Sequence, residues 1–408
     1  MPVQKSLLIA FLTALLIVGL ALVSTMNSAT VKASTEVSGI ISLNTTWTKT
    51  RGPYDLTGNV VIDEGVTLTI EPGVTVNLNQ YYIRVNGTLT ARGTNTDNIY
   101  LNDGYLEFTA SSTGWNSQTR TGSIIENAVV NSMISTTEVS LLINNNTVNK
   151  SLSLAGGSPI ISKNSIAIVT GSDWLGRPVY HSVAISISDV FYLSNENTAQ
   201  VVDNTISGHF DHAAIAVGNG SPTIERNIIR NSYGYGGDAG YGQSGIVISG
   251  DARPIIKQNT ITQCANGIHI SDSPTPTIVN NNIESITNFN LYMGSRTVNV
   301  NAANNWWGTT DTATIDEKIY DYNDDFELGK VNYTPFLTAA NSAAMPDPNA
   351  PTPTIAPTSS PTASPSTSPT PSQEPRQTEP TEALVGVAIA AIVLGAGLGL
   401  LIYLIKRK

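Results

Sequence analysis

Short runs of alternating apolar and polar residues fill the chain between residues 38 and 340. Clear examples are AISIS, AIAVG, GIVIS and GIHIS, which begin at Ala184, Ala214, Gly245 and Gly267. Alternation places the apolar side chains of a strand on one face and its polar side chains on the other. No stretch of this region has the apolar spacing of a convincing amphipathic helix. The pattern predicts an all-β region built from short strands.

An asparagine recurs at one place in this pattern, after an aliphatic residue and two variable ones. Its spacings along the chain are 19, 18, 40, 23, 32, 22 and 23 residues. A base period near 20 residues, with insertions, is typical of a solenoid. The repeated asparagines are Asn127, Asn146, Asn164, Asn204, Asn227, Asn259, Asn281 and Asn304.

Short strands at this period predict a parallel β-helix over residues 38–310, closed at its C-terminal end by residues 311–342. Strands of successive coils lie about 4.8 Å apart in such a rod. Equivalent aliphatic positions are expected to stack in the core, as at Ile185, Ile215, Ile246, Ile268 and Leu291. Asparagine tolerates left-handed backbone geometry, and its amide can bond the next coil. The repeated asparagines are therefore interpreted as a structural ladder.

The N-terminus has the features of an export signal. Lys5 precedes an apolar run from Leu7 to Val23, and Val31 and Ala33 occupy the small-residue positions of a cleavage site. This arrangement predicts a signal peptide over residues 1–33, or an uncleaved anchor as the alternative.

The C-terminus has the features of a membrane anchor. Residues Ala383 to Ile405 are 23 apolar residues without a charge, enough to cross a bilayer as one helix. The basic residues 406–408 follow at once and predict a cytoplasmic tail. Residues 343–382 are rich in Pro, Thr and Ser and predict a disordered, extended stalk. The expected product is a single-pass protein of the cell membrane with an extracellular rod.

Charge and cysteine content narrow the choice of partners and of stabilising bonds. The net charge is −10 at pH 7, and without the leader 1–33 and the tail 406–408 the remaining 16 bases and 31 acids give −15. Such a surface excludes nucleic acid as a partner. Cys264 is the single cysteine, so no intrachain disulfide can form. Six N-x-Ser/Thr sequences predict a glycoprotein: Asn44, Asn86, Asn145, Asn149, Asn219 and Asn332.

The segments VTLTIEPGVTV and IRVNGTLTARGT, with the repeated NTI turns, resemble the right-handed parallel β-helix (pectate-lyase-like) superfamily. NNWWGTTD and the following KIYDYNDDFELGKVNYTPFL are similar to the segment that closes the β-helix of many surface-anchored archaeal and bacterial members. The stalk and tail helix resemble those of archaeal surface proteins. The resemblance covers about residues 38–340 and implies the fold. It does not imply one activity, because the superfamily includes lyases, hydrolases, isomerases, adhesins and the copper-site maturation protein NosD.

Two adjacent tryptophans occur where the repeat ends. Trp306 follows Asn304 by two residues, the spacing at which other coils place a core isoleucine. We expect Trp306 to point into the core and Trp307 to face the closing segment Ile315–Phe336, so that the pair forms a structural cap. The alternative is a platform for a ligand. The acidic run Asp321 to Asp325 lacks the spacing and glycine of an EF-hand loop.

Two coils carry long insertions at the same turn. The distance from the ladder asparagine to the first core residue of the next strand is 9 to 11 residues in three coils, but 21 after Asn164 and 19 after Asn227. Because coils stack in register, the loops 170–182 and 231–245 are expected to leave one edge of the rod, with the turn 207–212 between them.

These loops contain the residues expected of a sugar-binding site, namely aromatic rings for stacking and acids for hydroxyl groups. The candidate ligand-binding residues are Asp173, Trp174, Arg177, Tyr180, His181, His209, Asp211, His212, Tyr233, Tyr235, Asp238 and Tyr241. A harmless insertion is the alternative.

Two further interpretations stay open at the same loops. Asp173, Asp211 and Asp238 supply carboxylates for a glycoside hydrolase or another polysaccharide-acting enzyme such as a lyase. His181, His209, His212 and His269 offer imidazoles for a metal, as in a NosD-like copper-handling factor. No metal site is assigned and no cofactor is predicted, with a divalent metal left open. The leading hypothesis is a surface protein that binds a polysaccharide or cell-envelope glycan, acts in adhesion or supports the envelope.

Overall fold

The computed structural model describes residues 34–168, 171–172, 178–179, 181–188, 197–208, 210–230, 243–294 and 298–354. These residues fall within one compact unit, Met1–Ala356. The predicted signal peptide 1–33, most of the stalk 343–382, the apolar segment 383–405 and the tail 406–408 lie outside them. Within the described ranges, no helix is long and apolar enough to cross a membrane.

The described strands form two large sheets. Ten short strands make up the first: β2 (Thr45–Trp47), β4 (Thr67–Ile70), β7 (Thr88–Arg92), β9 (Ile124–Glu126), β11 (Leu142–Asn144), β14 (Ile160–Ser162), β19 (Gln200–Val202), β22 (Thr223–Glu225), β25 (Ile255–Lys257) and β28 (Thr277–Val279). Nineteen make up the second: β1 (Thr35–Ile41), β3 (Tyr54–Ile62), β5 (Thr75–Asn77), β6 (Tyr82–Val85), β8 (Ile99–Phe108), β10 (Ala128–Thr137), β12 (Thr147–Val148), β13 (Leu152–Ala155), β15 (Ser165–Ile168), β18 (His181–Ser188), β20 (Thr205–Gly208), β21 (Phe210–Val217), β23 (Ile228–Arg230), β24 (Ser244–Ile248), β26 (Thr260–Thr262), β27 (Asn266–Ile270), β29 (Asn282–Glu284), β30 (Leu291–Met293) and β32 (Ile319–Tyr320).

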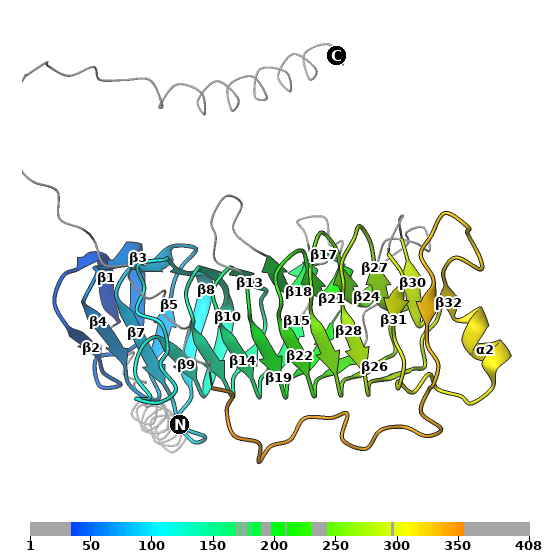
Figure 1. Cartoon of the computed structure of the whole chain (residues 1–408). Helices are drawn as coiled ribbons and strands as arrows, with labels where there is room; N and C mark the ends of the chain where they lie inside the picture. The colour runs from blue at the N-terminus through cyan, green and yellow to red at the C-terminus, as the bar shows by residue number, and fades with distance from the viewer. Residues whose placement is uncertain are drawn as a thin grey trace, which may run out of the picture. The chain divides into compact units, whose positions relative to one another are not determined.

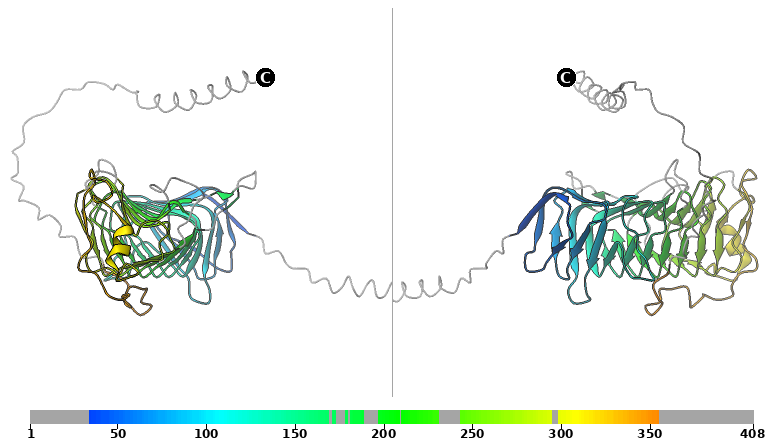
Figure 2. Two further views of the ribbon diagram at one scale, coloured as in Figure 1. Left: turned by 90° about the vertical axis from the view of Figure 1, so that its right-hand side faces the viewer. Right: turned by 60° about the vertical axis from the view of Figure 1, so that its left-hand side comes forward.

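The nineteen-stranded sheet covers two faces of the rod. Its long strands β3, β8 and β10 each pair with different strands at their two ends, so they carry the sheet around a corner. The pairings between successive coils are parallel throughout both large sheets. The coils lie side by side along a straight axis in Figure 1 and superpose when the rod is seen end-on in Figure 2. The structure confirms the predicted parallel β-helix.

The core is a set of stacked aliphatic rows. Ile185, Ile215, Ile246, Ile268 and Leu291 follow one another in register, and each is 0% exposed. The residues two positions later in the same strands also face inward, and they form a second buried row. Residues of period two therefore fill the rod, as the sequence pattern predicts.

A ladder of buried asparagines fixes one corner of the rod. From Asn164 onward, the side-chain oxygen of each rung accepts the backbone N–H of the asparagine one coil earlier at 2.9 Å, and the Asn146 oxygen accepts the Ala128 N–H at 2.8 Å. The side-chain nitrogen donates to a backbone carbonyl of the preceding coil at 2.8 to 3.0 Å. The rungs are Asn146, Asn164, Asn204, Asn227, Asn259, Asn281 and Asn305. Every one of these amides is therefore satisfied inside the protein, which buried polar groups require.

The prediction that Asn127 and Asn304 belong to this ladder is wrong by one residue in each case. Asn127 and Asn304 have φ angles of 50° and 59°, the left-handed geometry of the residue that precedes a rung. The rung position after Asn127 is Ala128, whose N–H bonds Asn146, and the last rung is Asn305. Asparagine suits both adjacent positions, the first for its backbone and the second for its amide.

This shift reverses the predicted roles of the two tryptophans. Counted from Asn305, the core position two residues on is Trp307, which is 2% exposed and joins the main core cluster. Trp306 is half-buried, and its Nε1 donates to the Glu284 carboxylate at 2.8 Å. A slip of one residue exchanges the two faces of a strand.

The segment after Trp307 closes the C-terminal end. Its helix α2 (Thr312–Glu317) begins at Asp311, whose carboxylate accepts the Thr314 N–H, and buries Ile315. The short strands β31 (Val300–Asn301) and β33 (Val331–Asn332) pair beside it. Asp321 is buried, and it accepts the Val331 N–H at 2.8 Å. The end of the core is thus covered by a helix, a strand pair and a bonded carboxylate.

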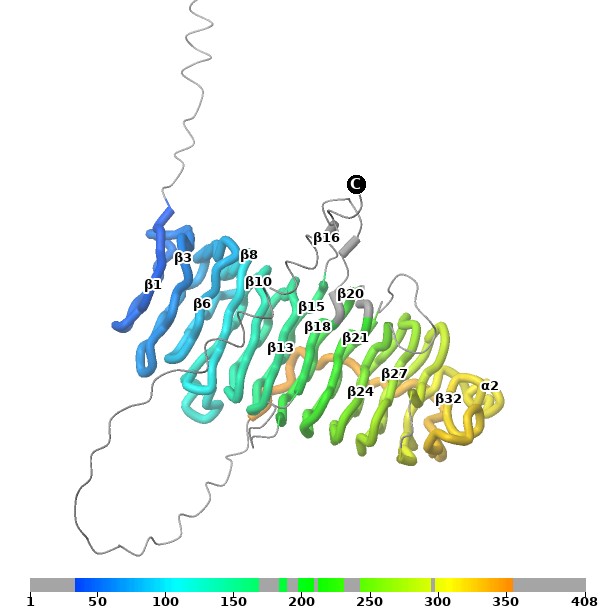
Figure 3. The backbone as a smooth tube through the Cα atoms, turned by 90° about the horizontal axis from the view of Figure 1, so that it is seen from above, coloured from blue at the N-terminus to red at the C-terminus, as the bar shows by residue number. Residues whose placement is uncertain are grey.

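Residues 341–354 correct the predicted start of the stalk at residue 343, because they run back along the rod as a strap (orange in Figures 1 and 3). The Asn341 backbone N–H donates to the Asn282 Oδ1 at 2.7 Å, and the Asn341 carbonyl accepts from the Asn282 Nδ2 at 3.0 Å. Further along, Thr260 donates to the Ala344 carbonyl at 2.5 Å and Asp203 accepts the Asp347 N–H at 2.9 Å. Lys163 then donates to the carbonyls of Pro348 and Ala350. The strap therefore reaches several coils back from the closed end.

Candidate functional site

Three successive coils interrupt the nineteen-stranded sheet at one turn. The loops lie between β15 and β18, between β20 and β21, and between β23 and β24. The strands that precede the loops pair with one another in register, and so do the strands that follow them. Both ends of each loop are therefore stacked, so the three loops leave the same edge of the rod. The first and third loops are two coils apart, roughly 10 Å.

Most of the predicted ligand-binding side chains lie outside the described residues: Asp173, Trp174, Arg177, Tyr180, His181, His209, Asp211, Tyr233, Tyr235, Asp238 and Tyr241. The backbones of His181 and Asp211 belong to β18 and β21. Within the first loop, β16 (Gly171–Ser172) and β17 (Pro178–Val179) pair antiparallel, so this loop contains a hairpin.

His212 and His269 are the predicted candidates whose side chains are described. His269 points outward in the alternation of β27 and yet is 2% exposed. A Cβ atom at Gly294 would lie 2.2 Å from its Nε2, so the backbone beside β30 is packed directly on the imidazole. Burial, and after it the like charge of His212, lower the pKa of His269 to about 4. His269 is therefore neutral at physiological pH.

His269 begins a row of outward-facing rings. Register continues from His269 to Tyr292 and on to Tyr320. The His269 and Tyr292 rings meet edge to face, with centroids 5.1 Å apart. Tyr292 stacks on Tyr320 at 4.9 Å, and Phe289 lies 5.6 Å from Tyr292. We call Phe289, Tyr292 and Tyr320 the aromatic row; all three are half-buried.

The sequence analysis did not identify the aromatic row. The signal was present, because Tyr292 and Tyr320 occupy the outward position that follows the His269 position in successive coils. The coil after His269 is followed by the closing segment, so register alone did not show that Tyr320 continues the row.

Two of the four histidines proposed as metal ligands, His212 and His269, have described side chains, so only these two can be compared with the metal hypothesis. Across the described ranges, no group of three or more His, Cys, Asp or Glu side chains could hold a metal ion. His181 and His209 are outside the described side chains, so the four-histidine arrangement remains a prediction.

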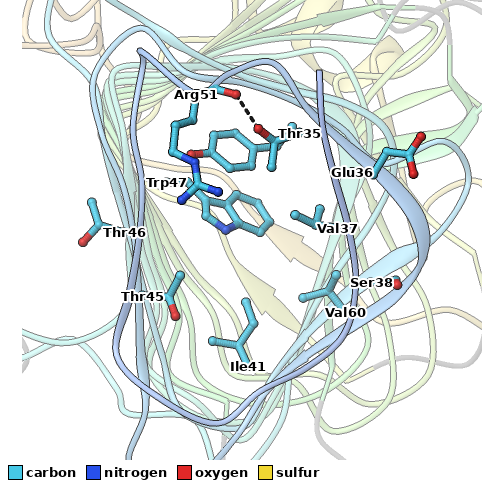
Figure 4. Close-up of a pocket in the computed structure, with 11 residues that line it drawn as sticks. Thr35, Glu36, Val37, Ser38, Ile41, Thr45, Thr46, Trp47, Arg51 and Val60 are labelled. Atoms are coloured by element: carbon cyan, nitrogen blue, oxygen red, sulfur yellow. Dashed lines mark hydrogen bonds between the residues drawn. The ribbon is translucent and has the colours of Figure 1, made fainter. Parts of the chain in front are cut away.

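Within the described residues, no segment covers the cavity at the N-terminal end of the rod, in contrast to the closed C-terminal end. A cavity of about 430 Å³ faces solvent there, and its lining includes Val37, Ile41 and Val60 (Figure 4). Trp47 stacks on Tyr54 at its floor, with centroids 4.8 Å apart and an interplanar angle of 12°. This aromatic pair seals the first coil, since both rings are almost fully buried.

A further insertion, between β8 and β9, presents Trp115 on the outer face of the ten-stranded sheet. Trp115 packs with the outward residues Ile124, Leu142 and Ile160 in a small apolar cluster separate from the core. The Arg92 guanidinium lies 5.1 Å from the centre of the Trp115 ring. Cavities of about 350 and 240 Å³ border this pair, and Arg120 lines both. The departure from the repeat period at residues 109–123 was the sequence signal that could have revealed it.

Comparison with known proteins gives a family match for part of the chain. The family model described as a right handed beta helix region matches residues 188–313. Protein bark beetle of Drosophila melanogaster is 41% identical over 58 residues, which are 13% of this chain and 2% of that protein. The crystal structure of the periplasmic alginate epimerase AlgG is similar over 70% of this chain and 74% of that chain, with 11% identity and a TM-score of 0.29.

The family match covers the coils that carry the second and third loops, Phe289, Tyr292 and Trp307, and it ends before Tyr320. Parallel pairing continues through the coils that precede residue 188, with one register shift between Asn131 and Met133 in the pairing of β8 with β10. The described residues therefore form a parallel β-helix, and residues 188–313 match the right-handed β-helix family model.

Proposed function

We propose that this β-helix is displayed at the cell surface and binds a polysaccharide or cell-envelope glycan along the edge formed by its three loops and the aromatic row. The observation that carries the proposal is the continuous register from the loop-bearing strand β24 through His269 to Tyr292 and Tyr320. Loop ends and rings thus occupy one face of one sheet.

The exposed parts of these rings suit a sugar ligand. Pyranose rings present apolar C–H faces that stack on tyrosine and phenylalanine, and tyrosine adds a hydroxyl for hydrogen bonding. Tyr292 and Tyr320 stack face to face on each other, with an interplanar angle of 19°, so their outward edges form one aromatic strip two coils long. The predicted loop residues Trp174, Tyr233 and Tyr235 would extend that surface toward β18.

Membrane display is part of the proposal. It rests on the leader 1–33, the apolar segment Ala383 to Ile405 and the basic tail 406–408. The rod between them supplies a rigid surface, and the Pro- and Thr-rich residues after the strap supply distance from the membrane.

A glycan array tests the binding proposal. The probe is the leaderless chain through Ala356, where the compact unit ends. Tyr292→Ala is expected to weaken binding about tenfold, because one stacking contact of about 1.4 kcal/mol is lost. Tyr100→Ala is the matched control, since this tyrosine is 42% exposed on a distant coil. Equal losses for the two variants, or no glycan bound by the parent, would reject the proposal.

An enzyme acting on polysaccharide is the second candidate that the loops permit. It requires two carboxylates about 5 to 9.5 Å apart, for which Asp173, Asp211 and Asp238 are the candidates. Incubating the bound glycan with the chain and measuring product length separates the two functions. Shortened or unsaturated products that vanish in Asp173→Asn or Asp238→Asn would favour catalysis, whereas intact glycan favours binding. Repeating the incubation with added copper and with a chelator tests the metal-handling hypothesis.

A further inference from the structure

The strap ends in a groove beside Trp115. Thr352, Pro353 and Thr354 line one side of the cavity of about 240 Å³, and Trp115 and Arg92 line the other. The cavity is not closed by these strap residues, so room remains between the strap and the rod.

The rod side of this groove is held in place before any partner arrives. The backbone N–H of Trp115 donates to the Ser140 carbonyl at 2.5 Å, and the backbones of Asn116 and Thr121 form an antiparallel bridge across the base of the insertion. Trp115 is 7% exposed and rests on Leu142. Arg92 lies over the ring, with its Nε 3.7 Å from the Glu126 carboxylate. A fixed ring flanked by a guanidinium is an established kind of surface for extended proline-rich segments.

The strap segment in the groove has the matching chemistry. Pro351 and Pro353 fix their own φ angles and favour an extended backbone, so little conformational entropy is lost on docking. The Pro-Thr dipeptide that enters the groove recurs further along the chain, at Pro357, Pro361, Pro369 and Pro380. The chain thus contains several copies of the dipeptide that the groove holds.

We propose that the Trp115 groove is an exchange site, which holds Thr352–Thr354 of its own chain and accepts a Pro-Thr segment from the stalk of a second copy. Copies anchored in one membrane raise the effective concentration of each other's stalks, so a weak groove is sufficient for lateral association. This inference rests on the membrane display proposed above but not on glycan binding, because it concerns a different face of the rod.

A labelled peptide with the sequence of residues 351–362, PTPTIAPTSSPT, tests the groove by fluorescence anisotropy on the full chain in detergent micelles. The double variant Pro351→Ser/Pro353→Ser weakens the resident segment and is expected to bind the peptide at least tenfold more tightly than the parent. Adding Trp115→Ala should remove that binding, whereas adding Trp306→Ala, a tryptophan far from the groove, should leave it intact. A peptide with every proline replaced by alanine should not bind.

A second variant guards against local unfolding of the Trp115 insertion. Arg92→Ala removes the guanidinium and leaves the ring, and it is expected to weaken binding about fivefold. Absence of peptide binding to the double proline variant would overturn the proposal. So would peptide binding that is the same with and without Trp115.

Exchange between copies is measured by crosslinking differently tagged full chains reconstituted in the same vesicles. Crosslinks between tags that decrease with Trp115→Ala support the proposal. Crosslinks confined to single chains would show that the groove serves only its own strap, which contradicts exchange.

Discussion

Replacing Asn227 with alanine tests the buried ladder at its centre. The Asn227 Oδ1 accepts the Asn204 backbone N–H at 2.9 Å, and its Nδ2 donates to the Val201 carbonyl at 2.8 Å. Both bonds lie inside a rod where Asn227 is 0% exposed, so water cannot replace them. Loss of the partner of a buried polar group costs roughly 1–3 kcal/mol. Two such groups imply a loss of about 4 kcal/mol in the free energy of unfolding.

The control uses the same substitution in a second row of amides on the surface of the rod. Asn131 donates to Asn102 at 2.8 Å and accepts from Asn149 at 2.7 Å, but these side chains are half-exposed. Water replaces both bonds in Asn131→Ala, so its cost is expected within about 1 kcal/mol.

Urea unfolding followed by circular dichroism measures both variants, and hydrogen exchange locates the change. Because coils in a solenoid interact with nearest neighbours, exchange should rise first around β19 and β23. Equal destabilisation of the two variants would refute the reasoning, since burial would then not matter. Asn227→Asp, which keeps the acceptor and loses the donor, should also fall well below the parent.

Three further predictions concern the cap, the buried imidazole and the topology. Trp307→Ala should lower the free energy of unfolding by about 3–5 kcal/mol and loosen the last coils. Trp306→Ala should lower it by under about 1.5 kcal/mol, because it loses chiefly the bond to Glu284. Thermal unfolding that ranks the two variants in the opposite order would contradict the corrected register. The pKa of His269 is about 4 in the folded protein, below its unfolded value of 6.5. The contribution of the neutral imidazole to the free energy of unfolding is therefore fully present above pH 6.5. It is lost as the pH falls toward 4, by about 3 kcal/mol. The difference in unfolding free energy between the parent and His269→Gln should therefore change over this pH range, and a constant difference would argue against a neutral buried imidazole. Protease added to intact cells should release the rod by cutting after the strap, and a rod that stays protected would reject extracellular display.

The fold was predictable because two independent periods agree. Period two placed Ile215 and Ile246 in the core, and the period near 20 residues stacked their strands. The ends of the ladder were less predictable, because asparagine fits two adjacent positions for different reasons. Where a coil has Ala128 at the rung, or where Asn304 and Asn305 are neighbours, residue type alone does not select the position. The error then passed to Trp306 and Trp307, because one residue changes the face.

The candidate site was predictable only in outline. Register placed the loops at one edge before any coordinates, because parallel coils repeat their turns. The burial of His269 depends on Gly294, a contact between neighbouring coils that no local pattern encodes. The strap was hidden for a related reason. Its composition is that of a linker, and its order comes from Asn282, Asp203 and Lys163, which lie far away in sequence.

The strap also determines how the rod responds to mechanical load. A pull on the chain beyond Thr354 acts first on the contacts in the Trp115 groove, then on the bonds to Lys163, and reaches Asn282 last. The bonds are arranged along the pulled chain, so they break one after another rather than together. Each break lengthens the tether and lowers the tension while the coils and the Trp307 cap stay folded. The strap therefore releases before the rod unfolds and takes up part of the load.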